Sequence, residues 1–124
     1  YLSFINYKLL LIINDILGIK TKLLFSDSFT IVEGKNEKLI SICKQANANL
    51  YLSGPAARDY IDEKLFQQEN IEVQWMDYSG YPEYNQLYPP FVHEVSIIDL
   101  IFNEGPNATK FMKSFGNKNE NTIQ

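Results

Sequence analysis

The stretch Leu50–Ile61 constrains the fold of this chain more than any other. Three apolar residues run directly into Ser53-Gly54 and then into Pro55-Ala-Ala-Arg-Asp-Tyr. Serine and glycine suit a tight turn, and proline suits the first position of a helix because its missing N–H would be unpaired there anyway. A short buried strand followed at once by a helix is half of a βα unit. The stretch therefore predicts an α/β protein.

The rest of the chain repeats this alternation of helix and strand. We expect strands over 20–25, 50–52 and 71–76, and helices over 4–17, 36–45, from Pro55, 63–68, from Ser96 to Gly105, and 106–115. The predicted N-caps are Ser3, Asn36, Asp62 and Ser96. The βαβαβ order predicts a three-layer, Rossmann-like domain over residues 3–115, with a parallel β-sheet core and helices on both faces. Residues 116–124 are expected to form a flexible polar tail.

Two side chains are predicted to belong to the core. Trp75 alternates in phase with Ile71 and Val73, so we expect it to be buried. Cys43 is the only cysteine, so it can form no disulfide within the chain. Without a histidine or second cysteine nearby in sequence, it is interpreted as an inert core thiol in a reducing compartment.

Composition and charge exclude several classes of protein. Of the 124 residues, 45% are hydrophobic, which is enough for a packed core, and the net charge of −4 argues against a nucleic-acid platform. The longest apolar run, Leu9–Ile13, is too short for a membrane span and has no signal-peptide cleavage site after it. We therefore expect no membrane span in this chain. The chain begins without Met inside a predicted helix, which suggests the later part of a longer protein, and apolar surface left open would allow it to form homo-oligomers.

The ends of the predicted strands indicate where a ligand could bind. Ligands of parallel α/β sheets bind beyond the carboxyl ends of the strands, and here those ends carry Ser26-Asp27-Ser28, Ser53-Gly54 and Asp77-Tyr78. Asp77 is the candidate catalytic residue, as a base or an acceptor from sugar hydroxyls. The candidate ligand-binding residues are Ser53, Gly54, Arg58, Asp59, Tyr78, Tyr81 and Tyr88. Arg58 is the candidate for an anionic group, because its planar fork donates two parallel hydrogen bonds.

Structural alternatives exist for each of these residues. Many βα turns have no function, and Arg58 could instead pair with Asp62 one turn further along. The segment 78–93, rich in tyrosine and proline, is predicted to be a long irregular loop, and such loops are often functional. Its tyrosines could equally pin the loop to the domain through their rings.

Other catalytic and metal-binding signals are weak or absent. The chain has no G-x-G-x-x-G, P-loop or G-x-S-x-G motif, so no cofactor is indicated. His93 lacks the companions of a zinc site, so no metal is predicted and anchoring of the loop is favoured for it. Asp77 and Glu83 could form an acid–base pair, but six residues of loop separate them.

Several motifs together resemble the WbqC-like family of bacterial proteins. They are Tyr51-Leu-Ser-Gly-Pro-Ala-Ala-Arg-Asp-Tyr60, Leu17-Gly-Ile-Lys-Thr-Lys22, Glu72-Val-Gln-Trp-Met-Asp-Tyr-Ser-Gly-Tyr-Pro-Glu-Tyr84, Gln86-Leu-Tyr88 and Val95-Ser-Ile-Ile-Asp-Leu-Ile-Phe-Asn-Glu-Gly-Pro106. The resemblance runs from about Ser3 to Lys113. Family members carry a further N-terminal half with an opening rich in Gln, Pro and Tyr. The resemblance therefore implies that this chain corresponds to the C-terminal portion.

The resemblance also implies a cytoplasmic bacterial protein and a function. Genes of this family often lie among those for surface polysaccharides or nucleotide-sugars, which implies a transferase acting on a sugar or amino-sugar, with acyl or aminoacyl transfer as one form. Its partner would be a small-molecule sugar or nucleotide-sugar. The alternative is a non-catalytic binding or assembly subunit of a polysaccharide machine. A nucleotide-binding edge is a third interpretation, from fold analogy alone.

Overall fold

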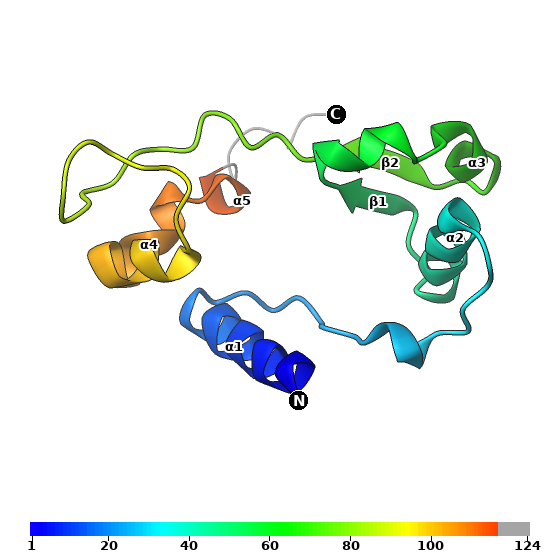
Figure 1. The fold of residues 1–124 in the computed structure, drawn as a ribbon, viewed down its shortest axis with the longest axis horizontal. Coiled ribbons are helices and arrows are strands. Elements are labelled where there is room, and N and C mark those ends of the chain that lie inside the picture. The colour runs from blue at the N-terminus through cyan, green and yellow to red at the C-terminus, as the bar shows by residue number, and fades with distance from the viewer. Residues whose placement is uncertain (117–124) are drawn as a thin grey trace, which may run out of the picture. The chain divides into compact units, whose positions relative to one another are not determined.

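The computed structural model describes residues 1–116, and their contacts divide the chain into two compact units. One unit combines residues 1–22 with the described residues from Ser79 onward, and the other comprises Leu23–Tyr78. Figure 1 shows the elements in chain order. That residues 3–115 form a single domain stays a prediction. The predicted tail over 116–124 lies outside the described residues except for Gly116, which belongs to the helix over Lys113–Gly116.

The unit 23–78 is built on two parallel strands. β1 (Leu50–Ser53) pairs with β2 (Glu72–Trp75) in a two-stranded sheet, with Leu50 opposite Glu72 and Ser53 opposite Trp75. The chain between the strands forms the 3₁₀-helix η2 (Pro55–Asp59) and the helix α3 (Glu63–Gln68). The predicted parallel pairing and the Pro55 turn are confirmed, although the turn leads into a 3₁₀-helix rather than an α-helix.

The core of this unit lies on one face of the strand pair. Tyr51, Val73 and Trp75 pack against a buried cluster drawn from α2 (Lys35–Gln45), η2, α3 and the residues that flank α3. The buried members are Ile40, Cys43, Ala57, Ile61, Phe66 and Ile71. Leu50 and Leu52, which alternate to the other face, are exposed. Trp75 is half-buried, so it lies on the predicted face with less burial than expected.

Two parts of the fold prediction are wrong for the described residues. Residues 20–25 form no strand, and the 3₁₀-helix η1 (Ser26–Ser28) follows them. The described sheet therefore has two strands rather than three, and within its unit the helices cover one of its faces rather than both. Lys20 and Lys22 alternate with Thr21 and Leu23, so this segment lacks the continuous apolar character of a buried parallel strand.

Local end signals explain several of the helix boundaries. The Asp62 side chain accepts a hydrogen bond from Lys64 N at 3.0 Å, and Ser96 Oγ accepts from Ile98 N at 3.3 Å, as predicted for N-caps. Gly18 ends the first helix with φ +69°, while Ile19 N donates to Asn14 O at 2.7 Å in a Schellman arrangement. The predicted caps Ser3 and Asn36 are wrong, because their helices begin one or two residues earlier.

The other unit is helical. It contains α1 (Leu2–Ile16), α4 (Ile97–Glu104), the 3₁₀-helix η3 (Gly105–Phe111) and α5 (Lys113–Gly116). Leu17, Leu100 and Ala108 form its buried core, with Ile13 and Tyr84 packed against them. The single helix predicted over 106–115 is instead divided at Met112, whose extended backbone separates η3 from α5. Residues 78–96 between β2 and α4 contain no helix or strand, as predicted.

Candidate functional site

The ends of the two strands meet at one edge of the sheet. Because β1 and β2 are parallel, Ser53-Gly54 and Asp77-Tyr78 leave from the same edge, and Met76 N donates to Ser53 O at 2.8 Å. A Cβ placed on Gly54 would lie 3.3 Å from the Tyr78 hydroxyl oxygen. Glycine therefore lets the tyrosine hydroxyl approach the turn closely. This contact brings the two strand exits together.

Arg58 lies on the face of Trp75. Its guanidinium carbon is 5.2 Å from the ring centroid, and the indole Nε1 donates to Glu63 Oε1 at 2.8 Å. This stack orients Arg58, and the cation remains exposed. The alternative pairing with Asp62 is not seen, because the Asp62 carboxylate caps α3 by accepting from Lys64 N.

Asp62 instead takes part in the turn that begins α3. Its backbone N–H donates to Asn36 Oδ1 at 3.0 Å, and Asn36 Nδ2 donates to Tyr60 O at 3.2 Å. Its side chain accepts from Lys64 N. These bonds fix the segment that follows Arg58 and leave the guanidinium without a carboxylate partner among the described residues.

The structure places six of the eight predicted site residues in the unit 23–78. Ser53 is buried and Gly54 half-buried, whereas Arg58, Asp59, Asp77 and Tyr78 are exposed. Tyr81 and Tyr88 belong to the other unit. There, the Lys113 ammonium lies 5.3 Å from the Tyr81 ring centroid and donates to Ser79 O at 2.7 Å. Tyr88 is exposed. That all eight residues line one cleft stays a prediction.

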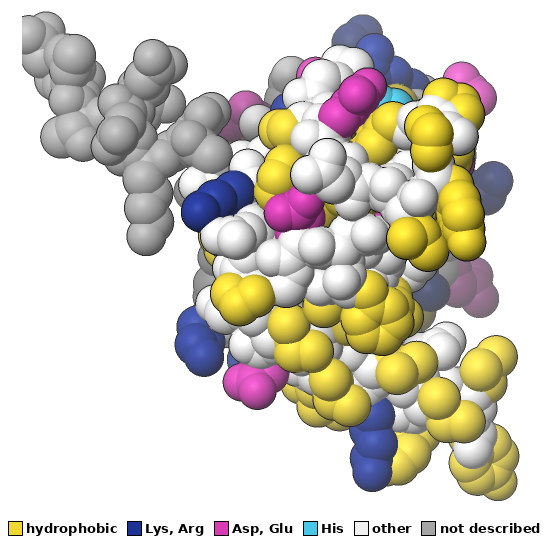
Figure 2. Space-filling view, turned by 90° about the vertical axis from the view of Figure 1, so that its left-hand side faces the viewer, with side chains coloured by type: hydrophobic (Ala, Val, Ile, Leu, Met, Phe, Trp, Pro, Cys, Tyr) yellow, Lys and Arg dark blue, Asp and Glu magenta, His cyan; other side chains and the backbone are white. Residues whose placement is uncertain are grey.

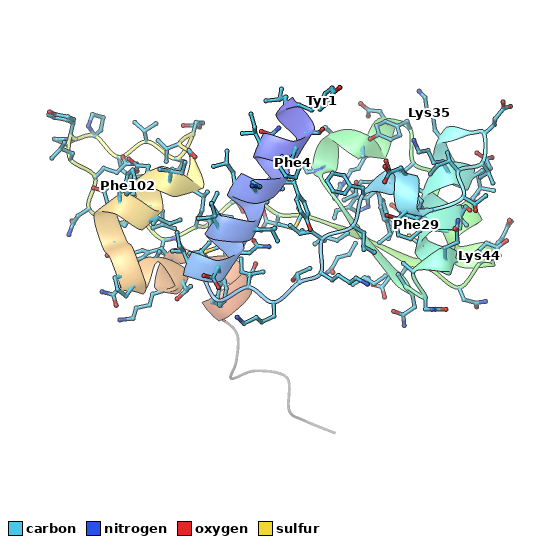
Figure 3. All side chains as sticks on the ribbon, turned by 90° about the horizontal axis from the view of Figure 1, so that it is seen from below. Tyr1, Phe4, Phe29, Lys35, Lys44 and Phe102 are labelled. Carbon is cyan, nitrogen blue, oxygen red and sulfur yellow. The ribbon has the colours of Figure 1, made fainter. Side chains whose placement is uncertain are left out.

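Two open hollows in the unit 23–78 lie away from this edge. One, of about 390 Å³, lies between α2 and α3, and its polar residues include the paired Lys44 and Glu69. Figure 3 labels Lys44 on α2. The other, of about 410 Å³, is lined by Asn49 and Asn70 near the amino ends of the strands. Neither contains a predicted site residue, and ligands of parallel sheets bind at the carboxyl edge, so that edge remains the candidate.

A polar network in the loop before α4 was missed by the sequence analysis. The Tyr84 hydroxyl donates to Asp99 Oδ2 at 2.6 Å, and Gln86 Nε2 donates to the same oxygen at 3.2 Å. Gln86 also bonds both backbone groups of Val92, at 2.8 Å each. The spacing of fifteen residues between Tyr84 and Asp99 gave no sequence signal.

Ring contacts complete this network. Phe91 packs edge-on against Tyr84 and against His93, with centroids 5.1 and 4.7 Å apart. Burial, and then the hydrogen bond to Asp99, raise the pKa of the Tyr84 hydroxyl above its ordinary value of 10.0. Tyr84 and Gln86 therefore hold the loop on α4 through Asp99, whereas His93 contacts Phe91 within the loop. Tyr84 thus has the anchoring role that was the structural alternative for the loop tyrosines.

The remaining chemistry-bearing side chains give no second site. Within the part of the chain that the structure describes, no three His, Cys, Asp or Glu side chains are grouped to hold a metal ion. Cys43 is buried, and burial raises the pKa of its thiol, as expected for an inert core cysteine. Across residues 1–116, no helix has both the length and the apolar character needed to cross a bilayer.

The fold and the strand-edge residues define a mixed α/β protein whose candidate site lies beyond a parallel strand pair. The chain belongs to the WbqC-like protein family, whose model matches residues 1–111. It is 45% identical over 112 residues to the uncharacterized protein Rv1507c of Mycobacterium tuberculosis. The match covers 90% of this chain and 48% of that protein, so the chain spans about half the length of this relative. No solved structure matches the sequence significantly.

Proposed function

We propose that the protein is a transferase that acts on a sugar or amino-sugar, in the cytoplasm, during synthesis of a bacterial surface polysaccharide. Acyl or aminoacyl transfer is the reaction class that we assign to it. One observation carries the proposal. Parallel pairing brings the Ser53-Gly54 turn and the Asp77-Tyr78 exit to one edge, where the Tyr78 hydroxyl lies against Gly54. Membership of the WbqC-like family supports the biological setting.

Each side chain at the edge has a role in this proposal. Arg58, exposed and oriented by Trp75, binds the anionic group of a nucleotide-sugar with its guanidinium fork. Ser53, Asp59 and the Gly54 backbone bind sugar hydroxyls. The ring of Tyr78 stacks on the apolar face of the sugar.

Asp77 is the proposed base. It takes the proton from the acceptor hydroxyl or amine as that group forms its bond to the acyl carbon. The bond from the acyl carbon to its carrier then breaks, and the carrier leaves with the electron pair and takes up the proton held by Asp77. A carboxylate at a strand exit is placed for this step because it lies at the edge where substrates of parallel sheets bind.

Ligand-dependent melting tests the binding step. UDP-glucose should raise the melting temperature progressively with concentration, by an amount equivalent to about 2.7 kcal/mol at one hundred times Kd. Melting curves with UDP alone and with glucose alone show whether the anionic group or the sugar contributes more to binding. Arg58→Ala should remove the response to UDP-glucose, and Arg58→Lys should retain part of it because the charge remains without the fork.

Two further variants sharpen this test. Lys38→Ala removes an exposed cation from α2, away from the strand edge, and should leave the response unchanged. Gly54→Ala adds a methyl group 3.3 Å from the Tyr78 hydroxyl, so it should displace that ring and weaken binding. If the Arg58→Ala variant responds to UDP-glucose as the wild type does, the proposed site at this edge is wrong.

A non-catalytic assembly subunit is the second candidate function. It is favoured by the exposed apolar side chains of α1, including Leu2, Ile5 and Ile12. An assembly subunit would show no turnover of any sugar donor and no melting shift with UDP-glucose. It would still form a defined complex through α1.

A further inference from the structure

Five apolar side chains of α1 form a regular stripe, and Phe4, Leu10 and Leu11 are exposed beside it. Leu2, Ile5, Leu9, Ile12 and Ile16 follow one another at alternating steps of three and four residues. This is the heptad spacing that places residues along one seam of a helix, at the a and d positions. Between 48% and 73% of the surface of each of these five residues is exposed. Figure 2 shows hydrophobic side chains gathered over α1, toward the bottom of the view, and Figure 3 labels Tyr1 and Phe4 at its start.

The helix is attached to its own unit by a different set of residues. Ile13 and Leu17, near its C-terminal end, pack against the core of Leu100 and Ala108. The stripe is therefore additional to the surface that α1 uses for folding. A preformed, exposed heptad seam is a surface for another helix.

The two charged residues of α1 identify the partner helix. We assign Leu2, Leu9 and Ile16 to the a position of the heptad, and Ile5 and Ile12 to the d position. Lys8 and Asp15 then both occupy the g position, beside the stripe. In an antiparallel pair of helices, g side chains lie next to g side chains of the other helix. Pairing Leu9 with Ile12 of a second copy places Lys8 beside Asp15 of that copy, and Asp15 beside its Lys8. The same register pairs Ile5 with Ile16.

We propose that α1 is a homodimerisation helix, which pairs with α1 of a second copy in an antiparallel, two-fold symmetric arrangement. The two Lys8–Asp15 pairs are then equivalent by symmetry, as a closed dimer requires. Neither residue has an ion-pair partner among the described residues, and both are exposed. The Lys8 ammonium lies 4.8 Å from the Phe4 ring centroid, and its flexible stem lets it turn from the ring to the partner carboxylate.

Charge also argues against a membrane surface as the occupant. Helices that lie on anionic membranes carry several Lys or Arg residues on their polar face. α1 has one lysine and one aspartate, so its side chains carry no net charge. The inference is independent of the proposed transferase activity, because it rests on the other unit of the chain.

Light scattering over a concentration series tests the dimer. The wild-type protein should reach twice the chain mass. Leu9→Lys and Ile12→Lys, at the two central layers, should each leave it monomeric with unchanged helix content by circular dichroism. Phe102→Lys is the matched control, because Phe102 is 84% exposed on α4, outside the stripe, and this variant should still dimerise.

Charge reversal tests the antiparallel register. Lys8→Asp or Asp15→Lys alone places like charges together twice, and each should weaken the dimer by about three- to tenfold in Kd. The double variant Lys8→Asp/Asp15→Lys restores both pairs and should restore the wild-type Kd. A double variant that is weaker than both single variants would contradict the register.

A wild-type protein that stays monomeric over the concentration series would overturn the proposal. The proposal would also be overturned if Leu9→Lys and Phe102→Lys weakened the dimer equally, because the chains would then associate through other surfaces. If another segment of a longer polypeptide covers the stripe, the protein will be monomeric and Leu9→Lys will lower its melting temperature. That result would replace the second copy with an intramolecular partner.

Discussion

Arg58 stacks on the face of Trp75, with its guanidinium carbon 5.2 Å from the ring centroid. The two residues come from different elements, since Arg58 lies on η2 and Trp75 is the last residue of β2. The stack therefore joins the segment after the first strand to the end of the second. It orients the cation at the edge where the candidate ligand site lies.

The indole hydrogen bond of Trp75 is expected to contribute to stability. Trp75→Phe removes the 2.8 Å bond from Nε1 to Glu63 and part of the ring on which Arg58 lies. We expect it to lower the free energy of unfolding by about 1–2 kcal/mol. Glu63→Gln keeps an oxygen acceptor and should cost less. Urea titration of both variants measures the difference, and equal losses would contradict a specific role for the indole N–H.

Phe66 is the central side chain of the larger core. It is fully buried, and its ring stacks on Tyr51 with centroids 5.4 Å apart. Phe66→Ala should therefore cost about 3–5 kcal/mol in a denaturant titration. Phe102→Ala truncates a residue that is 84% exposed and should change stability by less than about 0.5 kcal/mol. If the two substitutions have similar costs, Phe66 is not a core residue.

The Tyr84–Asp99 hydrogen bond should make stability depend on alkaline pH. The pKa of folded Tyr84 is raised above the unfolded value near 10.0 by burial and by Asp99. Its contribution is therefore full below about pH 10 and is lost as the pH rises through the raised folded pKa. Tyr84→Phe should lower the free energy of unfolding by about 1 kcal/mol at neutral pH. The stability of this variant should fall less steeply than that of the wild type as the pH rises above about 10.

Urea unfolding at a series of pH values measures this difference. Tyr88→Phe is the control in the same loop, because Tyr88 is exposed. It should follow the wild-type curve. A Tyr84→Phe protein whose stability parallels that of the wild type from neutral to alkaline pH would show that this hydroxyl does not couple to folding.

Cys43 should react slowly with thiol reagents in the native protein. It is buried, and burial raises the pKa of its thiol, so little of the reactive thiolate forms at neutral pH. Labelling by a disulfide reagent should accelerate as urea unfolds the protein. A cysteine introduced at exposed Ser3, in a Cys43→Ala background, should react at once. Immediate reaction of native Cys43 would show that α2 opens locally.

Much of the fold was predictable because its signals are local in sequence. Asp62 and Ser96 each cap a helix through a backbone N–H two residues ahead, and Gly18 ends α1 with a positive φ. The parallel pairing of β1 with β2 also follows from local order, because a strand–helix–strand unit of this length is a crossover connection. The Ser53-Gly54 turn and the Asp77-Tyr78 exit were placed at one edge for the same reason.

The predictions failed where apolar runs were ambiguous. Leu23, Leu24 and Phe25 suggested a third strand, yet this segment is irregular. A strand forms only when a neighbouring strand pairs with its backbone N–H and C=O groups. The pattern of residues within the segment does not show whether such a neighbouring strand exists. The apolar residues of α1 likewise do not show, from the sequence alone, which face of the helix is left exposed.

The sequence by itself determined the caps at Asp62 and Ser96, the end of α1 at Gly18, the βα turn at Pro55, the core position of Cys43 and the location of a candidate edge. These depend on residue types a few positions apart. Tertiary structure alone decided that Arg58 stacks on Trp75 rather than pairing with Asp62, that Tyr84 bonds Asp99, and that the heptad stripe of α1 is exposed. Each of these depends on which distant side chains share a surface, and that is set by packing of the whole chain rather than by spacing along it.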